Sequence, residues 1–159
     1  MSTNSPHPSP NLFFETANAY QRSAALKAAI DLELFTAIGT AGATAQEAAL
    51  KCGAAERGVR ILCDHLTIGG FLTKQDGRYT LTPDSATFLD QKSPAYLGGT
   101  LQFLQSPTIM AGFEHLTQAV RTGGTALLGA GTVEDAHPVW EDFARAMMPM
   151  MMMPAQFMA

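Results

Sequence analysis

Apolar residues recur at helical spacing in the middle of the chain. Four of them fall at positions i, i+3, i+4 and i+7 of one helical face, namely Val59, Leu62, Cys63 and Leu66. The pair Gly69-Gly70 follows, and glycine adopts the left-handed backbone angles of a helix end at little cost. The pattern therefore predicts an amphipathic helix that ends at this pair.

After the glycine pair the pattern changes to that of two short strands. The segments 71–75 and 78–82 are joined by Asp76-Gly77, which is the strongest two-residue signal for a β-hairpin. A two-residue loop also sets which side chains pair on one face of the ribbon. The expected pairs are Leu72 with Leu81 and Lys74 with Tyr79.

Two helical segments precede this unit. Residues 12–38 carry apolar side chains on more than one face, so we expect a helix that is buried on more than one side and bends or breaks near Ile30-Asp31. Thr44 and Glu47 have the spacing of a capping box, which predicts a second helix as far as Lys51. Helix, helix, helix and hairpin is the element order of a winged helix with an additional N-terminal helix.

The C-terminal part of the chain is predicted to be helical. Helices are expected over residues 83–90, 96–105, 108–121 and 139–153, with a glycine-rich loop over 123–135. The expected fold class is mainly α, a winged helix with one β-hairpin plus additional helices. The expected organisation is a disordered tail (1–10), a winged-helix domain (11–90) and a further helical segment (91–159).

Composition indicates an extensive protein interface. Apolar residues make up 47% of the 159 residues and charged residues 15%, against about 25% charged in an average soluble domain. The first predicted helix is rich in alanine and phenylalanine and has more apolar surface than one winged helix can cover. We therefore expect an intertwined homodimer that buries more than about 2,000 Å².

The chain shows no sign of a membrane partner. No apolar run approaches the roughly 18 residues of a membrane span, and the N-terminus does not resemble a signal peptide. Cys52 and Cys63 have no metal-type spacing and are expected to be free thiols in a reducing compartment. These features predict a cytoplasmic protein.

Winged helices serve DNA binding or protein docking, so a winged-helix transcriptional regulator is the alternative function. A DNA-binding protein needs Lys and Arg along the recognition helix and the wing. The basic residues here, Arg57, Arg60, Lys74 and Arg78, are accompanied by Glu56, Asp64 and Asp76. The local charge is close to zero and the net charge of the chain is −4, so we expect no nucleic-acid partner.

We identify no metal or catalytic constellation in the sequence. None of the four histidines, His7, His65, His115 and His137, has a metal-ligand partner at suitable spacing. No serine lies in a nucleophile elbow, and no lysine follows a phosphate-binding loop. The densest feature is residues 147–153, which contain six of the nine methionines and would suit a substrate pocket or an interface.

Several stretches, in this order, resemble the N-terminal half of S-adenosylmethionine-dependent O-methyltransferases that methylate aromatic or polyketide hydroxyls. They are LKAAIDLELFTAI, TAQEAA, GVRILCDHLTIGGFLTKQDGRYTLTP, SATFL, HLTQAVRTGG and FARAM. The resemblance extends over residues 12–150 and implies that the winged helix is a dimerisation domain. It also implies that the later helices roof the pocket for an aromatic or polyketide small molecule, above a separate Rossmann-like catalytic domain.

In this family the cofactor-binding turn and the histidine base lie after the stretch that matches. The segment most similar to such a glycine-rich turn is Gly129-Ala130-Gly131. Glu134 stands where that motif has its third glycine, so we interpret the segment as an ordinary loop. We expect that the chain binds no cofactor, that the complete enzyme uses S-adenosylmethionine, and that these residues alone are inactive. Truncation of a longer protein and division between two chains are both open.

The resemblance also assigns candidate substrate contacts. One face of the last predicted helix would point at the acceptor, through Val139, Phe143, Met147 and Met150. An aromatic ring and adaptable thioethers suit a flat phenolic acceptor, but the same stripe would also suit packing between helices. Pro149 departs from the family pattern, because proline tends to kink a helix.

Asn18 is the second candidate contact. It matches the position at which the first helix of the family reaches across the dimer to the partner's substrate. The alternative is an asparagine at the surface or the interface that touches no ligand.

Overall fold

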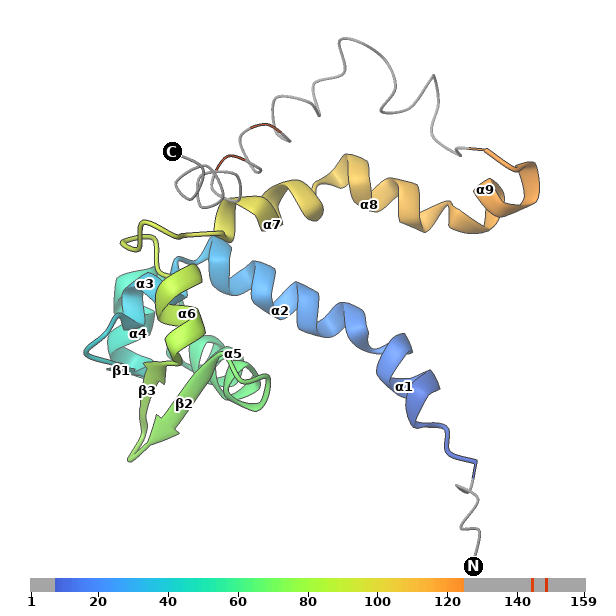
Figure 1. The fold of residues 1–159 in the computed structure, drawn as a ribbon. Coiled ribbons are helices and arrows are strands. Elements are labelled where there is room, and N and C mark those ends of the chain that lie inside the picture. Colours follow the sequence, from blue (N-terminus) through green and yellow to red (C-terminus); the bar gives the residue numbers. More distant parts are fainter. Residues whose placement is uncertain (1–7, 125–143, 145–147, 149–159) are drawn as a thin grey trace, which may run out of the picture.

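The computed structural model describes residues 8–124 together with Ala144 and Met148 (Figure 1). In chain order the elements are α1 (Asn11–Ala17), α2 (Ala19–Asp31), α3 (Leu34–Ile38), β1 (Ala43–Thr44), α4 (Ala45–Cys52), α5 (Glu56–Ile68), β2 (Leu72–Gln75), β3 (Arg78–Leu81), α6 (Pro83–Phe88), α7 (Gly98–Leu104), α8 (Pro107–Glu114) and α9 (Leu116–Thr122). The helices α3, α4 and α5 and the sheet form the winged-helix unit. The helices α1 and α2 project from it, and α7, α8 and α9 follow one another along a second arm (Figure 1).

The predicted hairpin and its register are confirmed. Leu72 pairs with Leu81 and Lys74 with Tyr79 in the antiparallel ladder of β2 and β3. Asp76 and Gly77 have φ values of 48° and 76°, the left-handed angles that a tight two-residue hairpin loop requires at both positions.

The sheet has a third strand that the sequence pattern did not reveal. β1 pairs with β3 through Ala43 opposite Tyr79, which gives the strand order β1-β3-β2. Gly42 permits this approach: it has φ +72°, and a Cβ there would lie 2.7 Å from Cγ2 of Thr80 and 2.8 Å from the carbonyl oxygen of Tyr79. The strand is two residues long and runs straight into a helix cap, so it has no periodicity of its own.

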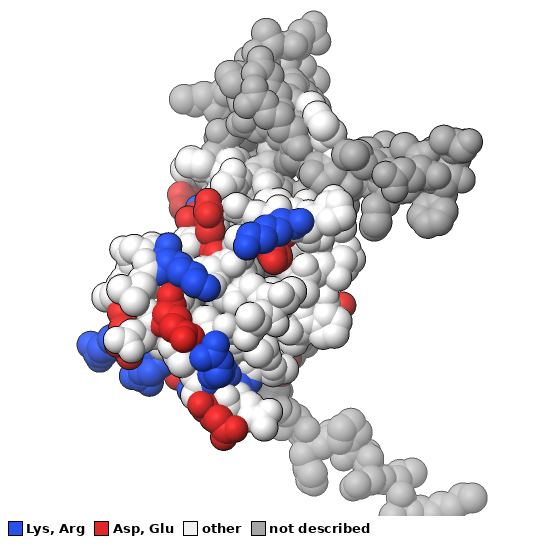
Figure 2. Space-filling model, turned by 90° about the vertical axis from the view of Figure 1, so that its left-hand side faces the viewer, with Lys and Arg blue, Asp and Glu red and all other residues white. Residues whose placement is uncertain are grey.

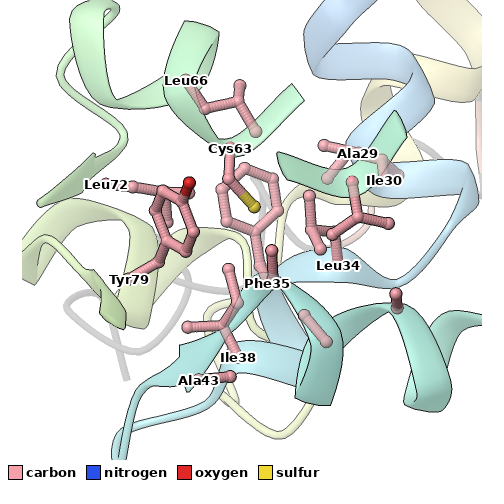
Figure 3. Packing of buried hydrophobic residues seen from close by; sticks show 14 residues of the cluster. Ala29, Ile30, Leu34, Phe35, Ile38, Ala43, Cys63, Leu66, Leu72 and Tyr79 are labelled. Carbon is pink, nitrogen blue, oxygen red and sulfur yellow. The ribbon is translucent and has the colours of Figure 1, made fainter. Parts of the chain in front are cut away.

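The core lies where α2, α3, α4 and α5 meet the sheet (Figure 3). Its buried apolar residues are Ala29 and Ile30 of α2, Leu34, Phe35 and Ile38 of α3, Ala43 of β1, Ala45, Ala48 and Ala49 of α4, Val59, Cys63 and Leu66 of α5, Leu72 of β2 and Tyr79 of β3. The apolar face predicted for α5 is therefore confirmed, with Leu62 packed at its margin. Both α4 and α5 are amphipathic: each helix buries one face in the core and leaves the opposite face exposed.

The predicted first helix is interrupted twice. The expected break near Ile30-Asp31 is confirmed, because α2 ends at Asp31 and Glu33, with a φ of 52°, precedes α3 as its N-cap. A second, unpredicted interruption lies at Asn18 between α1 and α2. The expected burial on more than one side is not seen within one chain, because α1 has no buried residue and α2 buries only Ala29 and Ile30.

Beyond the wing, α6 begins at Pro83 and α7 ends at Leu104, both close to the predicted bounds. The single helix expected over 108–121 is instead α8 and α9, divided at His115. At this division the carbonyl oxygen of Ala111 lies 2.8 Å from Nδ1 of His115 and also accepts from the backbone N–H of His115 at 3.3 Å. Most of the loop predicted over 123–135 and of the helix over 139–153 lies outside the described residues, apart from Ala144 and Met148, which are helical.

Candidate functional site

Three basic residues of the recognition helix and wing, Arg60, Lys74 and Arg78, form ion pairs within the molecule. Oδ1 of Asp64 on α5 accepts hydrogen bonds from Nζ of Lys74 at 2.7 Å and from the hydroxyl of Tyr79 at 2.8 Å. Arg60 lies one helical turn before Asp64, with its Nη1 3.6 Å from Oδ2. The ammonium of Lys74 also lies 4.8 Å from the centre of the Tyr79 ring. These contacts fasten the wing to α5.

The ionisation of this cluster follows from its hydrogen bonds. The bonds from Lys74 and then from Tyr79 hold the pKa of the Asp64 carboxyl below its ordinary value. The bond to Asp64 raises the pKa of Lys74. Burial raises the pKa of the Tyr79 phenol, so its hydroxyl remains a donor at neutral pH.

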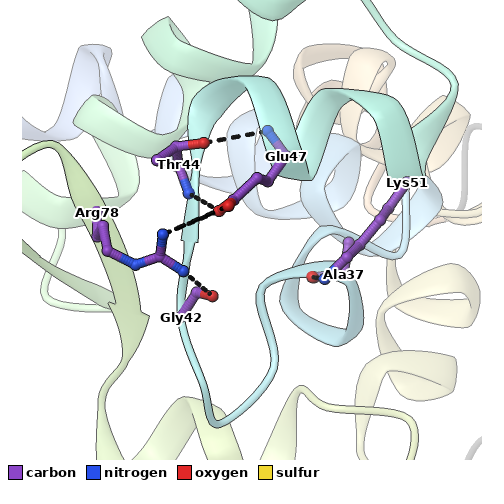
Figure 4. Close-up of polar contacts among 6 residues, drawn as sticks. All are labelled: Ala37, Gly42, Thr44, Glu47, Lys51 and Arg78. Atoms are coloured by element: carbon purple, nitrogen blue, oxygen red, sulfur yellow. Dashed lines mark hydrogen bonds and ion pairs between the residues drawn. The ribbon is translucent and has the colours of Figure 1, made fainter.

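Arg78, the other basic residue of the wing, forms a second ion pair (Figure 4). Nη1 of Arg78 lies 3.1 Å from Oε2 of Glu47, and its Nη2 donates to the carbonyl oxygen of Gly42 at 3.0 Å. Glu47 is also the acidic member of the predicted capping box, which is confirmed: its Oε2 accepts from the backbone N–H of Thr44 at 2.8 Å. That backbone hydrogen bond is the main reason why the pKa of Glu47 is lowered.

The surface gives no support to the DNA-binding alternative. Figure 2 shows Lys and Arg side chains intermixed with Asp and Glu rather than gathered in a basic patch. Among the described residues, Lys74 and Arg78 of the wing are bound to carboxylates, and Arg60 lies close to one. Binding of DNA phosphates would have to break these ion pairs, and this cost lowers the affinity for DNA.

Large apolar side chains are instead exposed on both projecting arms. On the first arm, Leu12 is 77% exposed, Phe13 68%, Phe14 56% and Tyr20 67%. On the second arm the exposed apolar residues are Leu104, Met110, Phe113, Leu116 and Val120. A folded monomer seldom leaves so many large apolar residues on neighbouring elements, so these faces indicate an interface.

An apolar groove of about 430 Å³ lies between the two arms, where α7 contacts α2. Its lining residues are Leu26, Ile30, Leu89, Leu97, Gly98, Thr100, Leu101 and Leu104. Sequence reasoning missed this groove, although the spacing of Leu26 and Ile30, and of Leu97, Leu101 and Leu104, places each set on one helical face. The pairing of the two faces depends on how α7 returns to α2, which no local pattern specifies.

The structure locates one of the sequence-predicted substrate contacts. Asn18 lies exposed at the junction of α1 and α2, where its Oδ1 accepts a hydrogen bond from Nε2 of Gln21 at 3.5 Å. The other four, Val139, Phe143, Met147 and Met150, lie outside the described residues. The proposed substrate contacts of all five residues therefore stay predictions.

The described residues are not suited to hold S-adenosylmethionine. The family binds it at a glycine-rich turn from a strand to a helix, next to an acidic residue. The strand-to-helix junctions in the described part of the chain lie at Thr44 and Thr82, carry no glycine and belong to a small antiparallel sheet. The candidate turn at Gly129-Ala130-Gly131 lies outside the described residues.

The described part of the chain also offers no cluster of metal-binding side chains. It contains no group of three or more His, Cys, Asp or Glu side chains that could hold a metal ion. Cys52 and Cys63 are free thiols, as predicted. Burial raises the pKa of Cys63 to about 12, so this thiol is protonated and unreactive at neutral pH.

No described helix is long and apolar enough to cross a membrane.

Comparison with known proteins identifies the winged-helix region. Residues 14–91 match the family model of the O-methyltransferase dimerisation domain. The chain is 36% identical over 113 residues to the 3-hydroxy-5-methyl-1-naphthoate 3-O-methyltransferase of Streptomyces sahachiroi, a match over 71% of this chain and 32% of that enzyme.

Solved structures show the same fold. The crystal structure of a protein from Nostoc punctiforme assigned as an O-methyltransferase superposes with a TM-score of 0.90 and 56% identity, over 95% of this chain and 46% of that one. Human N-acetylserotonin methyltransferase in complex with S-adenosylmethionine superposes with a TM-score of 0.67 at 22% identity, over 91% of this chain and 43% of that one. The chain thus spans about a third of the length of the curated relative and less than half of either solved structure. The chain therefore contains the dimerisation domain of the O-methyltransferase family, at residues 14–91.

Proposed function

We propose that this chain is the dimerisation and substrate-pocket part of an S-adenosylmethionine-dependent O-methyltransferase that acts on an aromatic or polyketide hydroxyl in the cytoplasm. The observation that carries the proposal is α1, an apolar helix of a dimerisation domain that has no buried residue within its own chain. Such a helix needs a partner surface.

The partner is a second copy of the same chain. Burial of each Leu or Phe side chain of α1 stabilises an assembly by about 1.5–3 kcal/mol, and a two-fold dimer buries each of them twice. The apolar faces of α8 and α9 extend this surface. We expect a homodimer interface above about 2,000 Å², the size usual for obligate dimers.

The acceptor is proposed to be a hydroxyl on an aromatic or polyketide molecule. The Streptomyces sahachiroi relative is named for 3-O-methylation of a hydroxynaphthoate, which is such an acceptor. In this proposal the segment 91–159 roofs the pocket, with Val139, Phe143, Met147 and Met150 against the ring and Asn18 contributed by the partner copy. Aromatic and thioether side chains suit a flat apolar acceptor because they can stack on it and adapt to its outline.

Methyl transfer itself is proposed to need residues beyond those described. S-Adenosylmethionine, bound in the human relative, supplies the methyl group in the complete enzyme. The described residues contain neither a suitable cofactor turn nor a metal cluster. Their proposed task is to hold two copies together and to shape the acceptor pocket.

Two experiments test this function. Sedimentation of the purified chain at micromolar concentration is expected to give a dimer, and a monomer would contradict the dimerisation proposal. In the complete enzyme, Phe143→Ala is expected to lower kcat/KM for the acceptor while the protein stays dimeric. Met148→Ala is the matched control, since Met148 is 59% exposed and lies outside the stripe. Equal kinetics of the two variants would remove Phe143 from the pocket.

A further inference from the structure

We infer that the pocket between α2 and the C-terminal end of α5 is a binding site for a small aromatic carboxylate. The two helices contact each other, and the pocket beside them has a volume of about 220 Å³. Its lining residues are Arg22 of α2, His65, Leu66 and Ile68 of α5, and Gly69 and Phe71 of the turn that follows. The inference does not rest on the proposed function.

Two basic side chains give the pocket its preference for an anion. Arg22 is exposed and His65 is half-buried, and neither side chain has a hydrogen bond or an ion pair with another described residue. Arg60, Lys74 and Arg78, in contrast, lie close to carboxylates. A guanidinium can donate two parallel N–H bonds to one carboxylate, and an imidazole has an N–H donor in either tautomer. The pocket therefore offers donors that the fold itself leaves unused.

No acidic side chain is among the residues that line this pocket. Two other pockets in the described part of the chain differ in this respect. One is lined by Asp31 and Glu33, and the other has Asp76 beside Lys74 and Arg78. A carboxylate in the wall repels a bound anion, so these two pockets are less suited to an acid.

The end of α5 is capped by its own backbone. The carbonyl oxygen of His65 accepts from the N–H of Gly69 at 3.0 Å, and that of Leu66 accepts from the N–H of Phe71 at 2.9 Å. Free carbonyl groups at a helix C-terminus carry partial negative charge and would oppose a carboxylate. Because these two carbonyl groups are already bonded, they oppose an anion less than free ones would.

The other walls are apolar and favour an organic acid over an inorganic anion. Leu66 is buried in the core, and the Phe71 ring packs edge to face on Phe35, with centroids 6.4 Å apart. Ile68 lines the pocket and is nevertheless 87% exposed. A ring bound here would remove the Ile68 side chain from water, which a phosphate or sulfate ion could not do.

The volume of the pocket limits the acid to a single ring. Sites for drug-sized ligands measure about 300–1,000 Å³, and this pocket is smaller. A benzoate-like molecule suits it better than a fused polyketide. The carboxylate would bind Arg22 and His65, and the ring would lie against Ile68 and Phe71.

Titration of the purified chain with benzoate, followed by calorimetry and by NMR, tests the site. We expect a Kd of about 1 mM, with the largest amide shifts at Gly69 and Phe71. Inorganic phosphate lacks the ring and benzyl alcohol lacks the charge, so each is expected to bind about 10-fold more weakly or worse. The absence of benzoate binding, or amide shifts confined to other residues, would overturn the site.

Arg22→Gln is expected to weaken benzoate binding about 10-fold or more, because it removes the charge and keeps a polar side chain. Arg57→Gln is the matched control, since Arg57 is also exposed and does not line the pocket. Ile68→Asp is expected to abolish binding by placing a carboxylate in the wall, with circular dichroism confirming that the variant is folded. Equal benzoate affinities of the Arg22 and Arg57 variants would overturn the inference and leave the proposed function untouched.

Discussion

The carboxylate of Asp64 lies 2.7 Å from the ammonium of Lys74 and so joins α5 to the wing. The same carboxylate oxygen accepts from the hydroxyl of Tyr79, whose side chain is only 1% exposed. One acidic residue thus satisfies a buried phenol and engages the lysine of the wing. In a DNA-binding winged helix that lysine would have to remain available for phosphate.

Tyr79→Phe is expected to lower the free energy of unfolding by about 1 kcal/mol. The substitution removes the hydrogen bond to Asp64 but keeps the ring in the core, and a typical hydrogen bond contributes about 0.5–1.5 kcal/mol. Urea denaturation measures the change. Tyr20→Phe is the matched control, since Tyr20 is 67% exposed and its hydroxyl accepts only a long, exposed hydrogen bond from Nε2 of Gln21 at 3.4 Å. Loss of that hydroxyl should change stability much less than the loss at Tyr79.

The contribution of Asp64 is expected to depend on pH. Because its pKa is lowered in the folded protein, the ionised carboxylate stabilises the fold fully above the ordinary value of about 3.9, and this stabilisation is lost as pH falls through the folded-state pKa. The stability difference between wild type and Asp64→Asn should therefore be constant at neutral pH and shrink below about pH 4. A difference that stays the same down to about pH 2.5 would show that the carboxylate's charge is not involved.

Gly98→Ala is expected to destabilise the chain by about 1–3 kcal/mol, the usual cost of overpacking. A Cβ at Gly98 would overlap the ring and hydroxyl of Tyr96, which lies across this end of α7. Gly99→Ala tests the same chemistry one residue later, where nothing lies within 4 Å of the added atom. That variant should be neutral or more stable by up to about 1 kcal/mol, because alanine favours helix over glycine. Equal melting temperatures for the two variants would contradict the packing of Tyr96.

Glu33→Gly is expected to raise stability by up to about 1 kcal/mol. Glu33 has a φ of 52°, and left-handed backbone costs a residue with a Cβ about 1–2 kcal/mol. Glycine removes this cost but loses more entropy on folding, so only part of the gain remains. Glu33→Val should have the opposite sign, because β-branched residues tolerate positive φ least. Thermal unfolding of the two variants distinguishes this backbone effect from the loss of the carboxylate, which both share.

Features set by neighbours in sequence could be read before the structure was known. The hairpin register follows from a two-residue Asp-Gly loop, and the start of α4 follows from Thr44 and Glu47. The buried face of α5 follows from the 3.6-residue period. In each case the interacting groups lie within about ten residues, so local geometry leaves few alternatives.

Other features could not be predicted from the sequence, because they depend on contacts between distant residues. The strand β1 exists only because Gly42 allows the backbone to approach Thr80 and Tyr79. The division between α8 and α9 at His115 has no glycine or proline to mark it, so residue type alone did not indicate it. The candidate pocket residues from Val139 to Met150 remain predictions.

The sequence by itself determined a winged helix with a neutral wing face and an apolar first helix, because periodicity, turn chemistry and charge balance are local properties. Only the tertiary structure decided where that apolar surface is left uncovered. It places Phe13 and the groove at Leu101 at opposite ends of the projecting α2, a separation set by the rigid length of one helix and by the return of α7 to its far end. Hydrophobic burial is non-directional, so the pattern could predict that these residues seek cover, but not which surface provides it.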